Sequence, residues 1–139
     1  MSNNILPMRD KAVDSEKITI NLGFVDLGRI DLMVQEGFYS NRSDFIRTAI
    51  RTLLSAQTEI VARSIERQTL ELGLRDFSRA DLEILRDSGR QLHVKIVGLA
   101  RIAADVSPEL AVATIASLTV LGALQASAAV KAALADRIH

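Results

Sequence analysis

A strict alternation of apolar and polar residues is the first readable pattern along the chain. The apolar positions are Ile18, Ile20 and Leu22, and the polar positions are Lys17, Thr19 and Asn21. Alternating residues point to opposite faces of a strand, so residues 17–22 are predicted to form a short strand with one buried face. No second strand pattern follows nearby. Because a lone strand exposes unpaired N–H and C=O groups, its simplest partner is the same strand of a second subunit.

Helical spacing replaces the alternation after residue 24. Apolar residues recur at helical spacing from Val25 to Glu36, and Gly37 supplies a stop. A run of capping residues then precedes a second amphipathic helix, with either Ser40 or Asn41 as its N-cap. The apolar positions of this helix are Phe45, Ile46, Ala49, Ile50, Leu53 and Leu54.

The middle of the chain, residues 57–90, is predicted to be a helical connector. Helical character continues from the second helix toward Gly73, either as one long helix or with a break near Gln57. A shorter helix then begins at Ser78, in a capping pattern, and ends at Gly89.

Residues 91–139 contain a repeat that emerges when the chain is shifted by 24 positions, so that residues 97–99 match residues 121–123 around a central glycine. Each copy begins with alternation into that glycine, which favours short strands turned at glycine, as in a small β-roll or solenoid. The alternative is helical, because residues 107–109 form a good helix start and alanine is abundant after them. Two copies are few, so we expect this segment to self-associate.

Neither end of the chain predicts secretion or a membrane span. Residues 1–16 are polar, contain no apolar run long enough for a signal peptide and are predicted to form a flexible arm. Residues 110–130 carry no charge and are long enough to cross a bilayer, but Gln125 and several Ser and Thr dilute the run. We therefore expect a cytoplasmic, nucleoid-associated protein.

The composition supports neither catalysis nor metal binding. The chain has no Cys and only two His, of which His93 lies in an apolar stretch and His139 is the last residue. No spacing places a base beside a nucleophile, so we expect no catalytic residues, no cofactor and no metal. Lys plus Arg and Asp plus Glu both total 17, which gives a formal net charge of zero. Any binding to nucleic acid must therefore rest on local contacts.

The order of strand, helix, glycine turn and capped helix resembles the ribbon-helix-helix family of repressors and antitoxins, the group that includes Arc, MetJ and CopG. The resemblance covers residues 17–56. It rests on the alternating strand, on Arg29-Ile30-Asp31 and Gly37-Phe38-Tyr39, and above all on the segment from Ser40 to Arg51. The chain departs from the family at Gly23-Phe24, where members commonly have a proline entering the first helix.

The resemblance implies a dimer whose two strands pair into an antiparallel ribbon that enters the DNA major groove. Lys17, Thr19 and Asn21 would point outward and reach base edges. The first turn of the second helix would hold a DNA phosphate through backbone N–H groups and the residues Ser40, Asn41, Arg42 and Ser43.

Other roles remain open for the arginines of this region. Arg42 has an alternative structural role, in which it pairs with Asp44 or with an acidic residue of the partner. Arg47 and Arg51 lie one turn apart and are expected on the solvated face of the second helix.

The expected fold class is α+β: an intertwined ribbon-helix-helix dimer at residues 17–56, a helical connector, and an apolar repeat at residues 91–139 for higher oligomerisation. The expected function is a sequence-specific repressor whose partners are double-stranded DNA and further copies of itself. One alternative is an antitoxin that represses its own operon and binds a toxin protein. Another is a polymer-forming scaffold protein, for which DNA binding serves only to localise the polymer on DNA.

Overall fold

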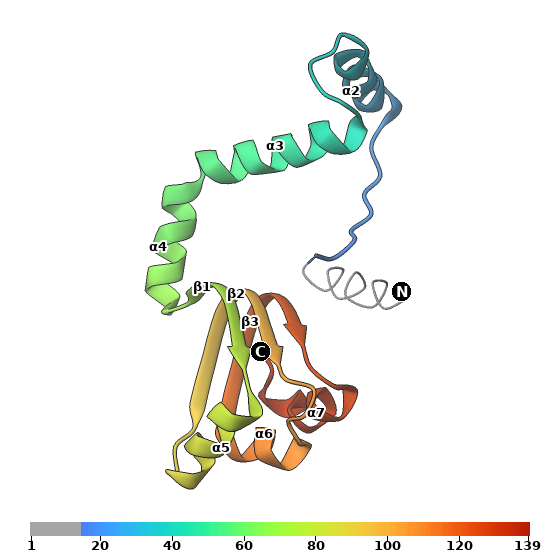
Figure 1. The fold of residues 1–139 in the computed structure, drawn as a ribbon. Helices are drawn as coiled ribbons and strands as arrows, with labels where there is room; N and C mark the ends of the chain where they lie inside the picture. The colour runs from blue at the N-terminus through green and yellow to red at the C-terminus, as the bar shows by residue number, and fades with distance from the viewer. Residues whose placement is uncertain (1–14) are drawn as a thin grey trace. The chain divides into compact units, whose positions relative to one another are not determined.

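The computed structural model describes residues 15–139, and the chain divides into two compact units, residues 1–61 and 62–139 (Figure 1). The first unit contains helices α2, Phe24–Gln35, and α3, Arg42–Ala56. Helix α4, Thr58–Gln68, begins in the first unit and continues into the second. Residues 1–14 of the arm predicted for residues 1–16 lie outside the described residues.

The helix boundaries in the first unit follow the signals in the sequence. Helix α2 ends before Gly37, whose φ of +85° is a conformation that favours glycine. Asn41 is the N-cap of α3, which decides between the two predicted capping residues. Gln57 leaves helical geometry, with φ −109° and ψ 18°, which decides between the two alternatives in favour of a break near this residue.

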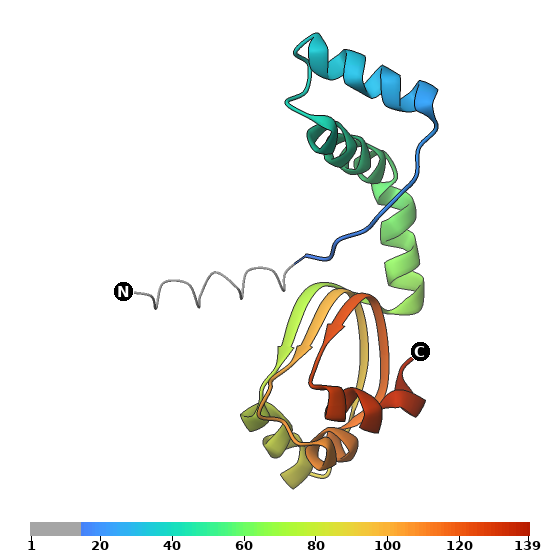
Figure 2. The ribbon, with the colours of Figure 1, turned by 90° about the vertical axis from the view of Figure 1, so that its right-hand side faces the viewer.

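The second unit is a parallel three-stranded sheet in which each strand leads into a helix (Figure 2). The strands lie side by side in the order β1, Glu71–Phe77; β2, Leu92–Ile102; and β3, Ile115–Gln125. The helices that follow them are α5, Arg79–Asp87; α6, Pro108–Thr114; and α7, Ala128–Ala133. A short 3₁₀ helix, η3, Ala135–Arg137, comes after α7. Helix α6 contacts both α5 and α7, so the helices stack in the same order as the strands.

The 24-residue sequence repeat is the register of this sheet. Gly98 pairs with Gly122, and the residues on either side of these two glycines also pair with a separation of 24 positions. In addition, Gly73 pairs with Gly98, so β1 is a first copy of the repeat, one strand earlier than the sequence indicated. Neither alternative for residues 91–139 holds alone, because each copy is an eleven-residue strand that runs through its glycine instead of turning there, followed by a helix.

The helical prediction for residues 57–90 is wrong over β1. Helices α4 and α5 lie within this range, but Glu71–Phe77 is a strand that pairs along its length with β2. Three charged residues, Glu71, Arg75 and Asp76, interrupt the apolar alternation that marks the later copies. The local sequence pattern therefore does not determine the conformation of residues 71–77. Pairing with the more apolar strand β2 determines it.

Three glycines allow the strands to approach one another closely. Gly73, Gly98 and Gly122 all have a φ between 123° and 138°. A Cβ atom at Gly98 would lie 2.1 Å from the carbonyl oxygen of Gly73, and one at Gly122 would lie 2.1 Å from that of Gly98. No side chain fits at such a distance, so the second and third positions of this ladder require glycine.

One continuous core holds the second unit together. It is formed by residues from all three strands and helices, with Leu82, Ala100, Ala111, Ile115 and Leu134 fully buried. Ser78, Ser107 and Ser127 cap α5, α6 and α7, and the hydroxyl of each accepts a backbone N–H from the first helical turn. The unit thus has a buried interior of its own.

Among the helices of residues 15–139, none is both long and apolar enough to cross a bilayer.

Candidate nucleic-acid interface

Residues 15–23 precede α2 and belong to no strand within the described residues. Strand pairing needs a partner, and the structure contains one copy of the chain. The outward residues of the predicted ribbon, Lys17, Thr19 and Asn21, are exposed. The apolar residues that alternate with them are exposed as well: Ile18 at 70%, Ile20 at 57% and Leu22 at 39%.

The first unit also lacks an interior. Among its described residues, Ile30 is the one buried side chain, and α3 buries none. Its exposed large apolar side chains include Phe24, Val25, Leu32, Phe38, Ile50, Leu53 and Leu54. An isolated soluble domain rarely leaves so many large apolar side chains in water. These surfaces therefore indicate an interface that buries them.

The turn between α2 and α3 is fixed by reciprocal capping. The Asn41 side chain accepts a hydrogen bond from the backbone N–H of Asp44 at 2.8 Å. In return, the Asp44 carboxylate accepts one from the backbone N–H of Ser40 at 2.9 Å. This exchange satisfies donors at the start of α3 and places Asp44 in its first turn.

Arg42 is held by an acidic residue of α2. Its Nε and Nη2 atoms donate to the two carboxylate oxygens of Asp31 at 2.7 and 2.8 Å. The Arg42 guanidinium lowers the pKa of Asp31, chiefly through this hydrogen bonding, and Asp31 in turn raises the pKa of Arg42. The sequence predicted a structural role for Arg42 as an alternative, but with Asp44 or a partner's acidic residue. Within one chain the ion-pair partner is Asp31.

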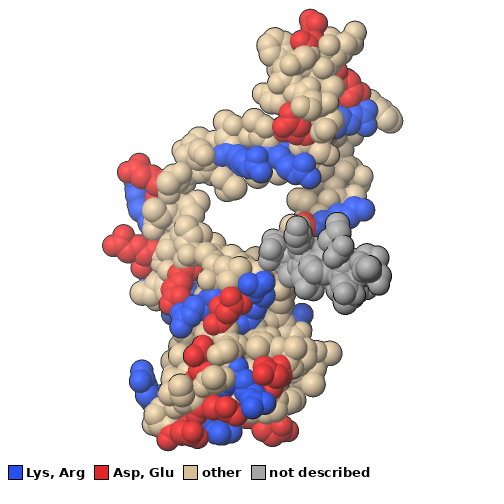
Figure 3. Space-filling model, in the orientation of Figure 1, with Lys and Arg blue, Asp and Glu red and all other residues tan. Residues whose placement is uncertain are grey.

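The predicted phosphate contacts lie together at one end of α3. Ser40, Asn41, Arg42 and Ser43 are consecutive and exposed there. Helix N-termini attract anions through their free N–H groups and dipole, although the nearby carboxylate of Asp44 opposes this field. On the face shown in Figure 3, basic side chains gather along α3, whose exposed arginines include Arg47 and Arg51.

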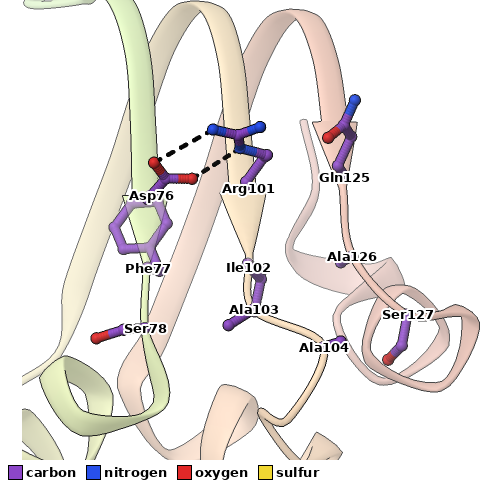
Figure 4. Close-up of a pocket in the computed structure, with 10 residues that line it drawn as sticks. All are labelled: Asp76, Phe77, Ser78, Arg101, Ile102, Ala103, Ala104, Gln125, Ala126 and Ser127. Carbon is purple, nitrogen blue, oxygen red and sulfur yellow. Dashed lines mark hydrogen bonds and ion pairs between the residues drawn. The ribbon is translucent and has the colours of Figure 1, made fainter. Parts of the chain in front are cut away.

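The C-terminal unit has a shallow pocket at the ends of its strands, with a volume of about 610 Å³ (Figure 4). Asp76 and Arg101 form an ion pair at 2.8 Å across β1 and β2, and Gln125 occupies the paired position on β3. Every polar side chain that lines the pocket has a partner within the chain. Its lining therefore offers no unsatisfied group that would identify a ligand.

Both histidines form hydrogen bonds with residues of strand β3. His93 Nδ1 lies 2.9 Å from the hydroxyl of Ser117 on the adjacent strand, and the backbone N–H of His139 donates to the carbonyl of Leu118 at 2.7 Å. Within residues 15–139, no group of three or more His, Cys, Asp or Glu side chains could hold a metal ion.

Residues 13–131 match the family described as the ribbon-helix-helix transcriptional regulator family. This match includes both the α2–α3 region and the repeats of the second unit. No curated protein and no solved structure gives a match.

Proposed function

The chain belongs to the ribbon-helix-helix transcriptional regulator family, and from this premise we propose that it binds DNA as a dimer through a two-stranded ribbon in the major groove. Membership in a family of transcriptional regulators confirms two expectations from the sequence: the chain is a DNA-binding regulator, and it is not an enzyme.

The observation that carries the proposed dimer is the exposed apolar row of residues 18–22. Ile18, Ile20 and Leu22 lie in water in one copy, within a unit that has a single buried side chain among its described residues. Antiparallel pairing with the same segment of a second copy would satisfy the backbone of both strands. It would also turn the apolar row onto the helices of both subunits.

In this arrangement Lys17, Thr19 and Asn21 read the base sequence. A lysine can donate to guanine O6 and N7, an asparagine can pair with adenine N6 and N7, and a threonine can contact the thymine methyl group. The start of α3 then anchors the protein to a phosphate. Asn41 and Arg42 already have partners in the chain, so the exposed Ser43 and the backbone N–H groups of the first turn are the strongest anchors.

The test is binding to the DNA upstream of the protein's own gene. A footprint should show paired half-sites, and binding should weaken with salt. Combined replacement K17A, T19A and N21A should remove specific binding, at roughly 1–3 kcal/mol for each lost base contact. Folding and dimerisation should survive, because these side chains face away from the proposed core.

A matched control for this variant is replacement of three charged residues of α5, Arg79, Glu83 and Arg86, by alanine. It removes charge far from the ribbon in sequence, so binding should change little. Wild-type protein that showed no salt-sensitive binding to upstream DNA would contradict the proposed function. Loss of the dimer in the K17A, T19A and N21A variant would contradict the assignment of these residues as outward-facing.

We also propose that the C-terminal unit brings dimers to a higher order. The outer face of its sheet carries an apolar stripe in which Leu72, Leu74 and Leu121 are 72%, 51% and 53% exposed. A folded core beneath this stripe favours self-association over a tail that would fold on a toxin. Replacement of Leu72 and Leu74 by serine should leave dimers but remove larger species in sedimentation velocity.

A further inference from the structure

The glycine ladder of the C-terminal sheet is open at both ends. At its two inner steps, the carbonyl oxygen of one glycine occupies the space that a Cβ atom of the next glycine would need. Gly73 has the same kind of backbone, with a φ of +129°, but no described atom lies within 4 Å of its Cβ position. The same geometry directs the carbonyl of Gly122 toward the outer side of β3, where the described residues supply no fourth strand. One end of the ladder therefore fits the other.

Strand β1 forms one edge of the sheet along its whole length (Figure 2). It pairs with β2 on one side, and among residues 15–139 no strand lies on its other side. Residues 71–76 are all exposed. Backbone N–H and C=O groups that face away from β2 are thus available to a further strand.

The opposite edge of the sheet is covered in part by the C-terminus. Leu118 of β3 forms a parallel bridge with Ile138, and its carbonyl accepts the backbone N–H of His139 at 2.7 Å. Beyond Leu118, residues 119–125 pair with no strand on their outer side in the described part of the chain. This open segment is as long as β1, which has 7 residues.

One further step of the ladder would pair Gly122 of one copy with Gly73 of the next. The strands of one copy already pair so that residues 72, 97 and 121 form a row across the sheet. Continued in the same register, residues 120–125 of one copy lie beside residues 71–76 of the next. All of these residues belong to the open part of β3, so the C-terminus at Leu118 keeps its place.

We infer that β3 of one copy adds in parallel to the outer edge of β1 of the next copy, glycine to glycine, and joins the C-terminal units head to tail. This inference rests on the higher order proposed above for these units, and it names the contact. The occupant is a second copy because the two ends of the ladder are complementary in backbone geometry, length and register. Since the contact uses two different edges, each copy keeps one edge free and the contact can repeat.

The charges of β1 do not oppose this contact. Arg75 pairs with Glu71 at 2.9 Å, and Asp76 pairs with Arg101 at 2.8 Å, so each charge has a counter-charge within the unit. Residues 119–125 carry no charge. Main-chain hydrogen bonds would therefore form between the two edges without bringing like charges together.

A double cysteine variant of the full chain tests the register, because the chain has no cysteine of its own. In L72C/L121C the two thiols of one copy lie two strands apart, roughly 9–10 Å, which is too far for a disulfide. Position 72 of one copy would lie beside position 121 of the next, at a strand spacing of about 4.8 Å. Mild oxidation should then give covalent dimers, trimers and larger species on a denaturing gel. L72C and L121C alone are the matched controls and should stay monomeric on that gel.

A second variant tests the close approach of the two edges. G73A would place a methyl group where the carbonyl of Gly122 of the next copy lies, so species larger than the ribbon dimer should disappear in sedimentation velocity. G89A is the matched control. Gly89 also has a positive φ, +70°, with no atom within 4 Å of its Cβ position, but it follows α5 and lies outside the strands. G89A should keep the larger species. Circular dichroism identifies a variant that has lost its fold, and the cysteine results then decide.

The outcomes separate this inference from the proposed function. If the wild type binds DNA and forms larger species, but L72C/L121C gives no more covalent product than the single variants, the inference fails and DNA binding stands. Covalent dimers from L72C alone would mean that two β1 edges pair with each other, which also overturns it, as do larger species in folded G73A. If the wild type binds DNA as a dimer and forms nothing larger, the inference and the proposed higher order fail together. Covalent chains of a protein that binds no upstream DNA would contradict the proposed function alone.

Discussion

At the scale of single residues, the turn between α2 and α3 depends on one ion pair with two hydrogen bonds. Asp31 and Arg42 are eleven positions apart in sequence, and no helical spacing joins them. The capping exchange between Asn41 and Asp44 was foreseeable, because an acidic residue three positions after an N-cap is a known pattern. The partner of Arg42 was not, since it depends on how two helices meet.

This ion pair predicts a pH dependence. The pKa of Asp31 is lower in the folded state than in the unfolded chain, so the pair stabilises the fold above the ordinary pKa of an aspartate. The stabilisation is lost as the pH falls through the lowered, folded-state pKa. D31N should therefore unfold at a lower temperature than the wild type at pH 7, and the difference should shrink below about pH 4.

Fluorescence of Tyr39, the single tyrosine of the chain, reports this transition in the first unit. D26N is the matched control, because Asp26 lies 3.8 Å from Arg29 in a looser and more exposed pair. A difference between D31N and wild type that stayed constant from pH 7 to pH 3 would contradict the role of this ion pair.

At the scale of helices and strands, the sequence pattern predicted most of the helix boundaries that local backbone preferences determine. The stops at Gly37 and Gly89 and the caps of α3 and α5 follow from backbone preferences of the residues present, whereas the sequence left the break at Gln57 as one of two alternatives. Strand β1 could not be found in this way, because its charges conceal the alternation and its partner lies 25 residues downstream. Pairing of residues 17–22 between copies stays a prediction, because it needs a second chain.

The glycine ladder predicts a difference between two chemically identical substitutions. G98A places a methyl group 2.1 Å from a backbone oxygen as well as straining φ, and should destabilise the C-terminal unit by more than about 3 kcal/mol. G73A strains φ in the same way but meets no atom within 4 Å. Its cost should be about 1–3 kcal/mol.

Urea denaturation followed by far-ultraviolet circular dichroism measures both variants against the wild type. The Tyr39 signal serves as an internal control, since it reports the first unit. Equal losses of stability in G98A and G73A would show that backbone conformation alone, and not the close approach of the strands, requires these glycines.

At the scale of the whole molecule, charge balance limits how the protein can hold DNA. Four arginines of the C-terminal unit pair with carboxylates; the pairs are Arg75–Glu71, Arg79–Glu83, Arg86–Asp87 and Arg101–Asp76. Figure 3 shows acidic and basic side chains interspersed over the face of this unit that it presents. With a net charge of zero, the chain has no broad positive field to add to its local contacts.

This balance predicts a shallow salt dependence. Each neutralised phosphate contributes about −0.9 to the slope of log K against log salt. Lys17 is the cation of each proposed half of the interface that no ion pair holds, since Arg42 is bound to Asp31, so a dimer would neutralise the equivalent of roughly two phosphates and give a slope of about −2. Fluorescence anisotropy with operator DNA over a range of salt concentrations measures this slope, and K17A should make it shallower.

The same reasoning separates specific from non-specific binding. Non-specific affinity comes almost entirely from phosphate neutralisation, so DNA of unrelated sequence should bind weakly even at low salt. Specific binding should exceed it by a roughly constant factor at every salt concentration, because hydrogen bonds from Thr19 and Asn21 to base edges release no counterions. A slope near −8, or equal affinities for operator and unrelated DNA, would mean that cations outside the ribbon and the start of α3 hold the DNA.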